Sequence, residues 1–262
     1  MPQKISQKLP LSVFIIAQDE EDRIPACIKS VVDWVSEVIV VDSGSQDQTV
    51  SVSKSLGARV IEKDWPGYGP QKRFAEEQCR NKWVLNLDAD ESISPELALE
   101  IQKVFHTLPP KNKAFKLKIK DVYPHQKKPG FWPYTYQVVR LYHLDQGRYS
   151  KSPIHDRILL KNGTEYITLK GDVYHKSIRS LSHLIEKANV YTNLQATVFI
   201  NQGKKVSLFR LAFEFPLSFL IGYFTRGNIL RGRYGLILAY HYAYIRFMRL
   251  AKLWEKQVII NE

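Results

Sequence analysis

Residues 83–91 read Trp-Val-Leu-Asn-Leu-Asp-Ala-Asp-Glu, and this stretch decides the fold class. Its largely apolar first half is typical of a strand covered on both faces, and Asp88 and Asp90 follow where that strand should end. Two carboxylates placed two residues apart can both approach one hard cation, which prefers oxygen ligands. An Asp-x-Asp pair is common and also fits a solvated acidic turn, so the surrounding pattern must decide between the two interpretations.

Three more apolar runs of strand length precede this stretch, and helical patterns separate them. We predict strands over 11–17, 37–42 and 58–61, and helices over 24–35, 47–56 and 70–80. Ser94 and Pro95 are typical of the N-cap and first position of a further helix. Strands that alternate with helices predict a parallel sheet with right-handed crossovers. Ligands bind beyond the carboxyl ends of such strands, where we expect Ala17, Asp42 and Asp88.

The pattern changes after Pro109-Pro110. Apolar residues alternate with lysines over 115–120, which predicts a half-exposed strand, and further strands are expected near 136–144, 156–160 and 164–174. Helical patterns return over 180–200, 206–225 and 233–256, with Pro216 expected to kink or end the second of these helices. The fold class predicted is therefore α/β, with a mostly parallel twisted sheet flanked by helices and a C-terminal helical extension. We expect three parts, 1–110, 111–178 and 179–262.

The composition fits a globular protein, with 262 residues of which 44% are hydrophobic and 12% aromatic. Two cysteines exclude a disulfide framework and suit a reducing compartment. The N-terminus lacks the pattern of a signal peptide, and no run reaches about 18 uninterrupted apolar residues, so we do not expect a spanning helix. The net charge is +12, and residues 204–256 carry +8 of it, from ten Lys or Arg and two Glu.

Other candidate residues lie near the predicted strand ends. A carboxylate at Asp42 can accept hydrogen bonds from a nucleobase imide or a ribose hydroxyl, although the Ser-Gly-Ser that follows also fits an Asx-turn. Lys72, near a predicted helix start, can pair with phosphate. The chain has neither a Gly-x4-Gly-Lys-Ser/Thr loop nor a Gly-x-Gly-x-x-Gly after its first strand, which argues against P-loop and dinucleotide sites.

Four segments resemble the inverting nucleotide-sugar glycosyltransferases of family 2, which have the GT-A fold. They are 12–21 (SVFIIAQDEE), 40–49 (VVDSGSQDQT), 69–73 (GPQKR) and 87–91 (LDADE). Asp19 and Arg73 replace residues that are usually Asn. The chain is also similar to the subfamily that adds glucose to the inner core of bacterial lipopolysaccharide or lipooligosaccharide. That likeness lies in 152–157 (SPIHDR), 174–177 (YHKS), 186–191 (EKANVY) and 251–255 (AKLWE).

The resemblance implies roles for the donor site. Asp42 would recognise uracil, Asp88 the ribose, and Asp90 would bind Mg²⁺ or Mn²⁺ on the diphosphate of a UDP-sugar. Ala17, Glu20 and Lys72 would complete the nucleotide-sugar site. Residues 1–110 would then form the nucleotide-sugar-binding half of the GT-A domain.

The resemblance also implies an acceptor half over 111–178. Inversion needs one in-line displacement, with a carboxylate that takes the proton of the acceptor hydroxyl. Asp156 is the candidate, since it stands where the subfamily usually has Glu after His. His155 would act as the base or contact the acceptor, and His175 would contact the acceptor.

The basic tail over 179–262 has two interpretations. Its aromatic and apolar residues can form helices that pack on the catalytic domain, with solvated charges. Alternatively, they form an interfacial surface against anionic lipid, which suits an acceptor in the inner leaflet. The second interpretation predicts a cytoplasmic protein, peripheral on the inner face of the bacterial inner membrane.

Two rival functions are weighed against a glucosyltransferase acting on a lipopolysaccharide core. A sugar-phosphate nucleotidyltransferase would show a Gly-rich basic signature after the first strand, where this chain has Gln18-Asp19-Glu20-Glu21. A basic nucleic-acid-binding protein would explain the charge, but no known motif of that class is present and acidic strand ends repel phosphate. We therefore expect a UDP-sugar and a glycolipid core as partners, and no nucleic acid.

Overall fold

The computed structural model describes residues 8–261 except 107, 125 and 153–155. The chain forms two compact units, each described by itself below. The sheet unit comprises Met1–Asp121 and Tyr134–Lys176, and the helical unit comprises Val122–Pro133 and Ser177–Glu262. The short segment Val122–Pro133, which connects two parts of the sheet unit, therefore belongs to the helical unit, and the sequence pattern did not indicate this.

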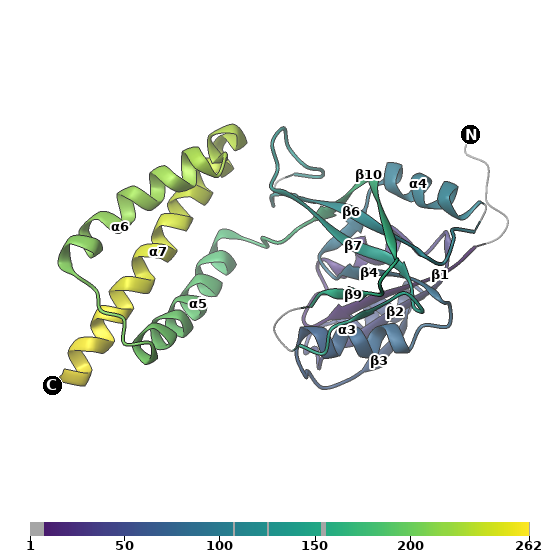
Figure 1. The fold of residues 1–262 in the computed structure, drawn as a ribbon, viewed down its shortest axis with the longest axis horizontal. Helices are drawn as coiled ribbons and strands as arrows, with labels where there is room; N and C mark the ends of the chain where they lie inside the picture. Colours follow the sequence, from purple (N-terminus) through teal and green to yellow (C-terminus); the bar gives the residue numbers. More distant parts are fainter. Residues whose placement is uncertain (1–7, 107, 125, 153–155, 262) are drawn as a thin grey trace. The chain divides into compact units, whose positions relative to one another are not determined.

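One eight-stranded sheet, in the order β3-β2-β1-β4-β7-β6-β10-β5, organises the sheet unit (Figure 1). Its strands are β1 (Leu9–Ala17), β2 (Val35–Asp42), β3 (Arg59–Glu62), β4 (Trp83–Asp88), β5 (Glu91–Ile93), β6 (Lys113–Asp121), β7 (Thr135–His143) and β10 (Glu165–His175). A separate hairpin pairs β8 (Gly147–Tyr149) with β9 (Ile158–Leu160).

The four N-terminal strands run parallel, as the alternation of strands and helices predicts. The later strands extend the same sheet with mixed direction, because β7 is antiparallel to both β4 and β6 whereas β10 is parallel to β6. The predicted fold class, a mostly parallel twisted sheet flanked by helices with a helical extension, is confirmed. Strand β5 was not predicted; it directly follows Asp90 and pairs with β10.

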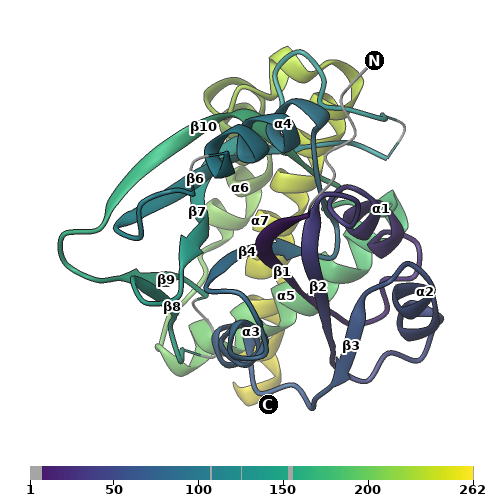
Figure 2. The ribbon, with the colours of Figure 1, turned by 90° about the vertical axis from the view of Figure 1, so that its right-hand side faces the viewer.

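Helices cover both faces of the sheet (Figure 2). They are α1 (Ile24–Lys29), α2 (Thr49–Ser55), α3 (Tyr68–Glu77) and α4 (Pro95–Phe105). Val13 and Ile15 belong to the core shared with α1 and α4, and Phe14 points into the opposite core, under α3. This alternation follows from the two-residue period of a strand. Ser94 caps α4 by accepting a hydrogen bond from the backbone N of Leu97 at 3.2 Å, as predicted.

The helical unit contains α5 (Leu181–Asn201), α6 (Leu208–Leu220), a π turn η1 (Ile221–Thr225), a 3-10 turn η2 (Asn228–Arg231) and α7 (Gly232–Asn261). Glu214 on α6 pairs with Arg246 on α7 at 2.8 Å. Gly222 lets η1 approach α7 closely, because a Cβ at this position would lie 3.0 Å from the Tyr242 ring. Pro216 does not end α6, which continues for another turn to Leu220.

Candidate active site

Three strands of the parallel half end side by side. Ala17 is paired with Asp42 in the register of β1 and β2, and Ile16 is paired with Asp88 in the register of β1 and β4. The predicted strand-end residues therefore meet at one edge of the sheet. This carboxyl edge is where parallel α/β sheets bind ligands.

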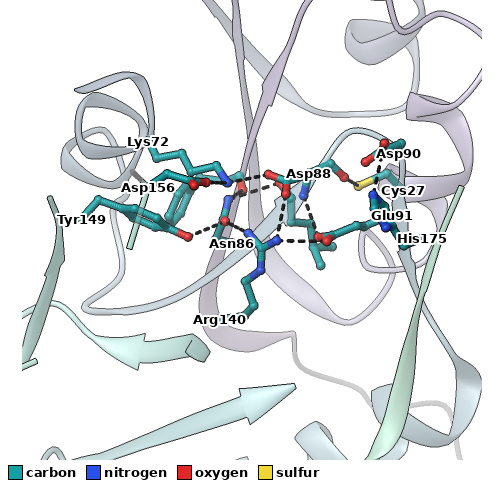
Figure 3. Close-up of polar contacts among 12 residues, drawn as sticks. Cys27, Lys72, Asn86, Asp88, Asp90, Glu91, Arg140, Tyr149, Asp156 and His175 are labelled. Atoms are coloured by element: carbon teal, nitrogen blue, oxygen red, sulfur yellow. Dashed lines mark hydrogen bonds and ion pairs between the residues drawn. The ribbon is translucent and has the colours of Figure 1, made fainter. Parts of the chain in front are cut away.

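The Asp88 carboxylate lies between two cations (Figure 3). Its Oδ1 is 2.7 Å from Lys72 Nζ and its Oδ2 is 2.8 Å from Arg140 Nη2. Burial alone would raise the pKa of Asp88, but Arg140 and Lys72 outweigh it and hold the pKa far below its usual range. Asp88 is consequently a permanent anion at the end of β4.

Lys72 also reaches Asp156, because its Nζ lies 2.6 Å from Asp156 Oδ2. The Lys72 side chain is buried, and the carboxylates raise its pKa although burial opposes the charge. The local sequence explains this placement. Gly67 is the N-cap residue just before α3 and has a φ of 112°. A Cβ at Gly69, in the first turn of α3, would lie 2.3 Å from the Ser152 carbonyl oxygen. Only glycine allows α3 to lie so close to the segment that leads to Asp156.

Behind Asp88 lies a buried polar network that the sequence analysis missed. The Arg140 guanidinium, on β7, donates to Asn86 Oδ1 and lies 3.0 Å from Glu91 Oε1. Tyr149 OH donates to the same Asn86 oxygen at 2.6 Å. Burial raises the pKa of Glu91, and the Asp88 charge adds to this, while Arg140 opposes both. The available signal was a lone arginine in the apolar run of β7, where a charge needs a buried partner.

Asp90 faces a different set of side chains. Its Oδ2 lies 3.4 Å from His175 Nε2, and His175 Nδ1 lies 2.9 Å from Asp121 Oδ1. Burial disfavours the charged imidazole, but these carboxylates prevail and raise the pKa of His175 to about 10. Arg23 also lies 3.4 Å from Asp90 Oδ2 and pairs with Glu20 at 2.6 Å. Two predicted residues thus lie in the cluster around Asp90: His175 directly, and Glu20 through its pair with Arg23.

The side chains around Asp90 would suit a divalent cation only if His175 gives up the proton that the neighbouring carboxylates hold on it, because a metal-bound imidazole is neutral. Carboxylate oxygen suits Mg²⁺ and Mn²⁺, and an imidazole whose other nitrogen meets a carboxylate is the usual arrangement of a metal-bound His. Asp90, His175 and Asp121 supply that pattern. Among the described residues no three His, Cys, Asp or Glu are grouped for a metal. Two protein ligands at this position would leave the remaining coordination positions to phosphate and water.

Asp42 is almost fully buried, and its contacts are local. Its Oδ2 accepts hydrogen bonds from the backbone N of Gly44 at 3.0 Å and of Ser45 at 2.8 Å. These contacts form the Asx-turn that the sequence left open as an alternative. The turn also fixes the loop after β2, since Ser43 N donates to the Ala17 carbonyl at 2.9 Å. His155 lies outside the described residues.

Comparisons with known proteins agree with this geometry. Residues 12–158, more than half of the chain, match the family described as Glycosyl transferase family 2. The chain is 40% identical to an uncharacterized glycosyltransferase of Rickettsia typhi over 94% of this chain and 87% of that one. It is 31% identical to a lipopolysaccharide core biosynthesis glycosyltransferase, LpsC, of Rhizobium meliloti over 96% and 94% of the two chains.

A solved structure of glucosyl-3-phosphoglycerate synthase from Mycobacterium tuberculosis, in complex with Mn²⁺, uridine diphosphate and glucosyl-3-phosphoglycerate, is 26% identical. The match covers 45% of each chain, somewhat under half of that protein's length, with a TM-score of 0.33. The match to the family and to the full-length relatives decides against the two rival functions. The chain belongs to glycosyl transferase family 2, and its sheet unit has the GT-A fold.

Proposed function

We propose that this glycosyltransferase moves a hexosyl group, glucose, from a UDP-sugar to a hydroxyl of a lipopolysaccharide or lipooligosaccharide core, with inversion. The relative from Rhizobium meliloti, described as a lipopolysaccharide core biosynthesis glycosyltransferase, supports the acceptor class because the alignment spans nearly the whole of both chains. Uridine and glucose are inferred from the resemblance of the strand-end motifs.

The observation that carries the mechanism is the Lys72 ammonium, which lies between Asp88 and Asp156 at 2.7 and 2.6 Å. A donor diphosphate competes with both carboxylates for this cation, since phosphate oxygens pair strongly with ammonium groups. When Lys72 turns to the diphosphate, Asp156 loses its partner. The freed carboxylate then accepts the proton of the acceptor hydroxyl as the new glycosidic bond forms.

The other predicted residues hold the donor. Asp88, kept ionised by Arg140, accepts hydrogen bonds from the ribose hydroxyls. Asp42 contributes by shaping the loop after β2 and by reading the uracil imide, with Ala17 and Glu20 beside it. Asp90, with His175 beside it, would hold Mg²⁺ or Mn²⁺, and the cation would supply positive charge to the diphosphate. The 3.4 Å distance from His175 to Asp90 supports a role for His175 beside the metal, and its contact with the acceptor stays a prediction.

A donor screen tests the proposal. The full chain is incubated with UDP-glucose and other UDP-sugars, with Mg²⁺, Mn²⁺ or EDTA, and UDP release and transfer to isolated lipopolysaccharide core are measured. We expect turnover with UDP-glucose only when metal is present. If no UDP-sugar binds and none is turned over, the proposed donor class is wrong.

Matched carboxamide variants test the residues. Asp156→Asn should lower turnover by roughly 10²-fold or more, the usual scale for a lost acid–base group. Asp90→Asn removes the charge of the proposed metal ligand and should abolish metal-dependent turnover. Asp145→Asn is the control, because Asp145 is a half-exposed carboxylate with a long 3.7 Å contact to Lys82. Wild-type turnover in Asp90→Asn would refute the metal assignment, and wild-type turnover in Asp156→Asn would refute the base.

A further inference from the structure

One side of α6 and η1 is apolar and exposed. Large side chains recur every three or four residues, so they form one stripe along the helix. This apolar stripe consists of Phe209, Phe213, Leu217, Leu220 and Phe224, and each of the five side chains is at least 50% exposed. Scattered apolar residues are normal on a surface, whereas a contiguous row of this size marks an interaction site.

The opposite side of the same helix is already occupied inside the helical unit. Glu214 and Ser218 are buried there, and Glu214 pairs with Arg246 of α7. Gly222 continues this buried side against Tyr242. The helix therefore has one side packed on α7 and one apolar side directed away from it. A one-sided helix of this kind suits an interface between water and lipid better than a span through the bilayer.

A second exposed apolar feature lies at the end of the stripe. Phe131 and Trp132, which we call the aromatic tip, are 91% and 52% exposed and come from a segment about ninety residues earlier in the chain. The Trp132 carbonyl accepts a hydrogen bond from Arg231 Nε at 3.0 Å, and a Cβ at Gly227 would lie 3.4 Å from Trp132 Nε1. Gly227 N in turn donates to the Phe224 carbonyl, so tip and stripe adjoin.

The tip is also fixed to α7. Tyr123, in the same segment, stacks on Tyr234 with ring centroids 4.8 Å apart and an interplanar angle of 3°. Two segments far apart in sequence thus present apolar side chains on adjoining parts of one unit. Tryptophan at such a position is typical of membrane interfaces, where its ring contacts lipid and its N–H remains hydrated.

Charge identifies the partner. The helical unit contains fourteen Lys or Arg and four Glu, so it carries +10 of the net charge of +12. Lys204, Lys205 and Arg210 lie at the start of the stripe, and Arg226 and Arg233 follow its end; all five are exposed. Lys127 and Lys128 stand beside the tip. Glu214, the sole acidic residue from 204 to 233 in the sequence, is buried against Arg246.

We propose that the apolar stripe and the aromatic tip together form a surface that binds the interface of an anionic lipid bilayer, with α6 lying in the plane of the membrane. Apolar side chains enter the boundary between headgroups and acyl chains, and the flanking cations pair with anionic headgroups. A second copy of the chain is a poorer occupant, because two faces with this charge repel each other. The proposal does not depend on the sugar that is transferred.

By length and composition alone, residues Leu208–Thr225 would also satisfy the requirement for a membrane span, with a mean hydropathy of 1.3. The sequence analysis did not expect such a segment. Arg210 and the Glu214–Arg246 pair argue for the interfacial position, since a span would place these charges in hydrocarbon. The experiment below separates the two arrangements.

Flotation of the full chain with vesicles tests the proposal. Vesicles of phosphatidylcholine with 30% phosphatidylglycerol should bind the protein, vesicles of pure phosphatidylcholine should bind it much less, and added salt should weaken binding. Bound protein should be released by alkaline carbonate. Carbonate-resistant protein would indicate a span and overturn the interfacial position, and failure to bind anionic vesicles would overturn the proposal.

Two double variants and one single control variant locate the surface. Phe213→Ser with Leu217→Ser removes the centre of the stripe, and Phe131→Ser with Trp132→Ser removes the tip; each pair should weaken vesicle binding roughly tenfold or more, from the lost apolar contact. Leu99→Ser, at an equally exposed leucine on α4 of the sheet unit, should bind as wild type does.

Circular dichroism confirms the fold of each variant. Two results would overturn the surface. One is wild-type vesicle binding in both double variants, and the other is an equal loss in Leu99→Ser. Light scattering gives the oligomeric state. If the chain is a dimer, the stripe variant is a monomer, and anionic vesicles bind neither protein, the face serves self-association instead.

Discussion

The sheet unit buries charged side chains, whereas the helical unit exposes large apolar ones. At the carboxyl edge of the sheet, Lys72, Arg140 and Glu91 are each no more than 5% exposed. On α6, Phe209 is 74% exposed. Each arrangement costs free energy in the isolated chain, by loss of hydration in the first case and by contact of apolar surface with water in the second. We propose that both departures from ordinary burial mark surfaces at which the protein binds a partner.

The two departures differ in how they are balanced. The buried charges compensate one another, so removing one member leaves the others without a counter-charge. The exposed apolar residues have no such dependence inside the helical unit, and their removal should leave the fold intact. Substitutions in the two units should therefore differ sharply in their effect on stability.

The largest expected effect follows from Arg140→Met. The substitution keeps much of the volume but removes one of the two cations beside Asp88 and, among the described residues, the one cation within 4 Å of Glu91. It should lower the free energy of unfolding by about 3–5 kcal/mol. Urea denaturation followed by tryptophan fluorescence measures it, because Trp34 and Trp83 lie in the core of the sheet unit.

Arg80→Met is the control for Arg140→Met. The Arg80 side chain is 78% exposed and its ion pair with Glu37 is long, at 3.6 Å, so its replacement should change stability by less than about 0.5 kcal/mol. Equal effects of the two substitutions would show that burial of the Arg140 network contributes little to the stability of the sheet unit.

The same comparison shows what the sequence could and could not predict. The parallel half of the sheet was predicted correctly, because its strands are continuous apolar runs separated by stretches with helical periodicity. The strand ends followed, since parallel strands finish at one edge. The ends of β1, β2 and β4, with Ala17, Asp42 and Asp88, could therefore be placed at the same edge from the sequence.

The Arg140 network could not be predicted for a physical reason. Arg140 reaches Asp88 only because β7 inserts next to β4, and an antiparallel partner some fifty residues away leaves no local periodicity. The aromatic tip was missed for the same reason. It joins the rest of the helical unit through the hydrogen bond between Arg231 and Trp132, which are 99 residues apart in the sequence. Long-range pairing decided both.

The sheet unit also buries a charged side chain away from the candidate site, that of Glu37. Glu37, near the opposite end of β2, accepts hydrogen bonds from Ser12 Oγ at 2.6 Å, Arg80 N at 2.9 Å and Arg59 Nη2 at 3.0 Å. Burial opposes the ionised form, but these donors prevail and lower the pKa of Glu37 below its ordinary value of 4.5.

This lowered pKa makes a prediction about pH. The ionised Glu37 stabilises the fold above the unfolded pKa of about 4.5, and the contribution disappears as pH falls through the lower folded pKa. Glu37→Gln should therefore cost roughly 1–2 kcal/mol at pH 7 and progressively less as the pH falls below about 4.5, as urea midpoints at a series of pH values would show. Glycosyltransferase turnover should not change. A cost independent of pH would mean that the side chain acts through its shape and not through its charge.

The smallest expected effect comes from Phe213→Ala in the helical unit, with Phe14→Ala in the sheet unit as its buried counterpart. Phe213→Ala removes an exposed ring from α6, and because alanine favours helix it should change stability by less than about 0.5 kcal/mol. Phe14→Ala removes a fully buried ring from β1 and should cost about 3–5 kcal/mol. Thermal unfolding of the full chain, followed by far-UV circular dichroism, measures both. A large loss from Phe213→Ala would mean that the stripe packs within the protein itself, and the exposed face of α6 would then no longer need a lipid partner.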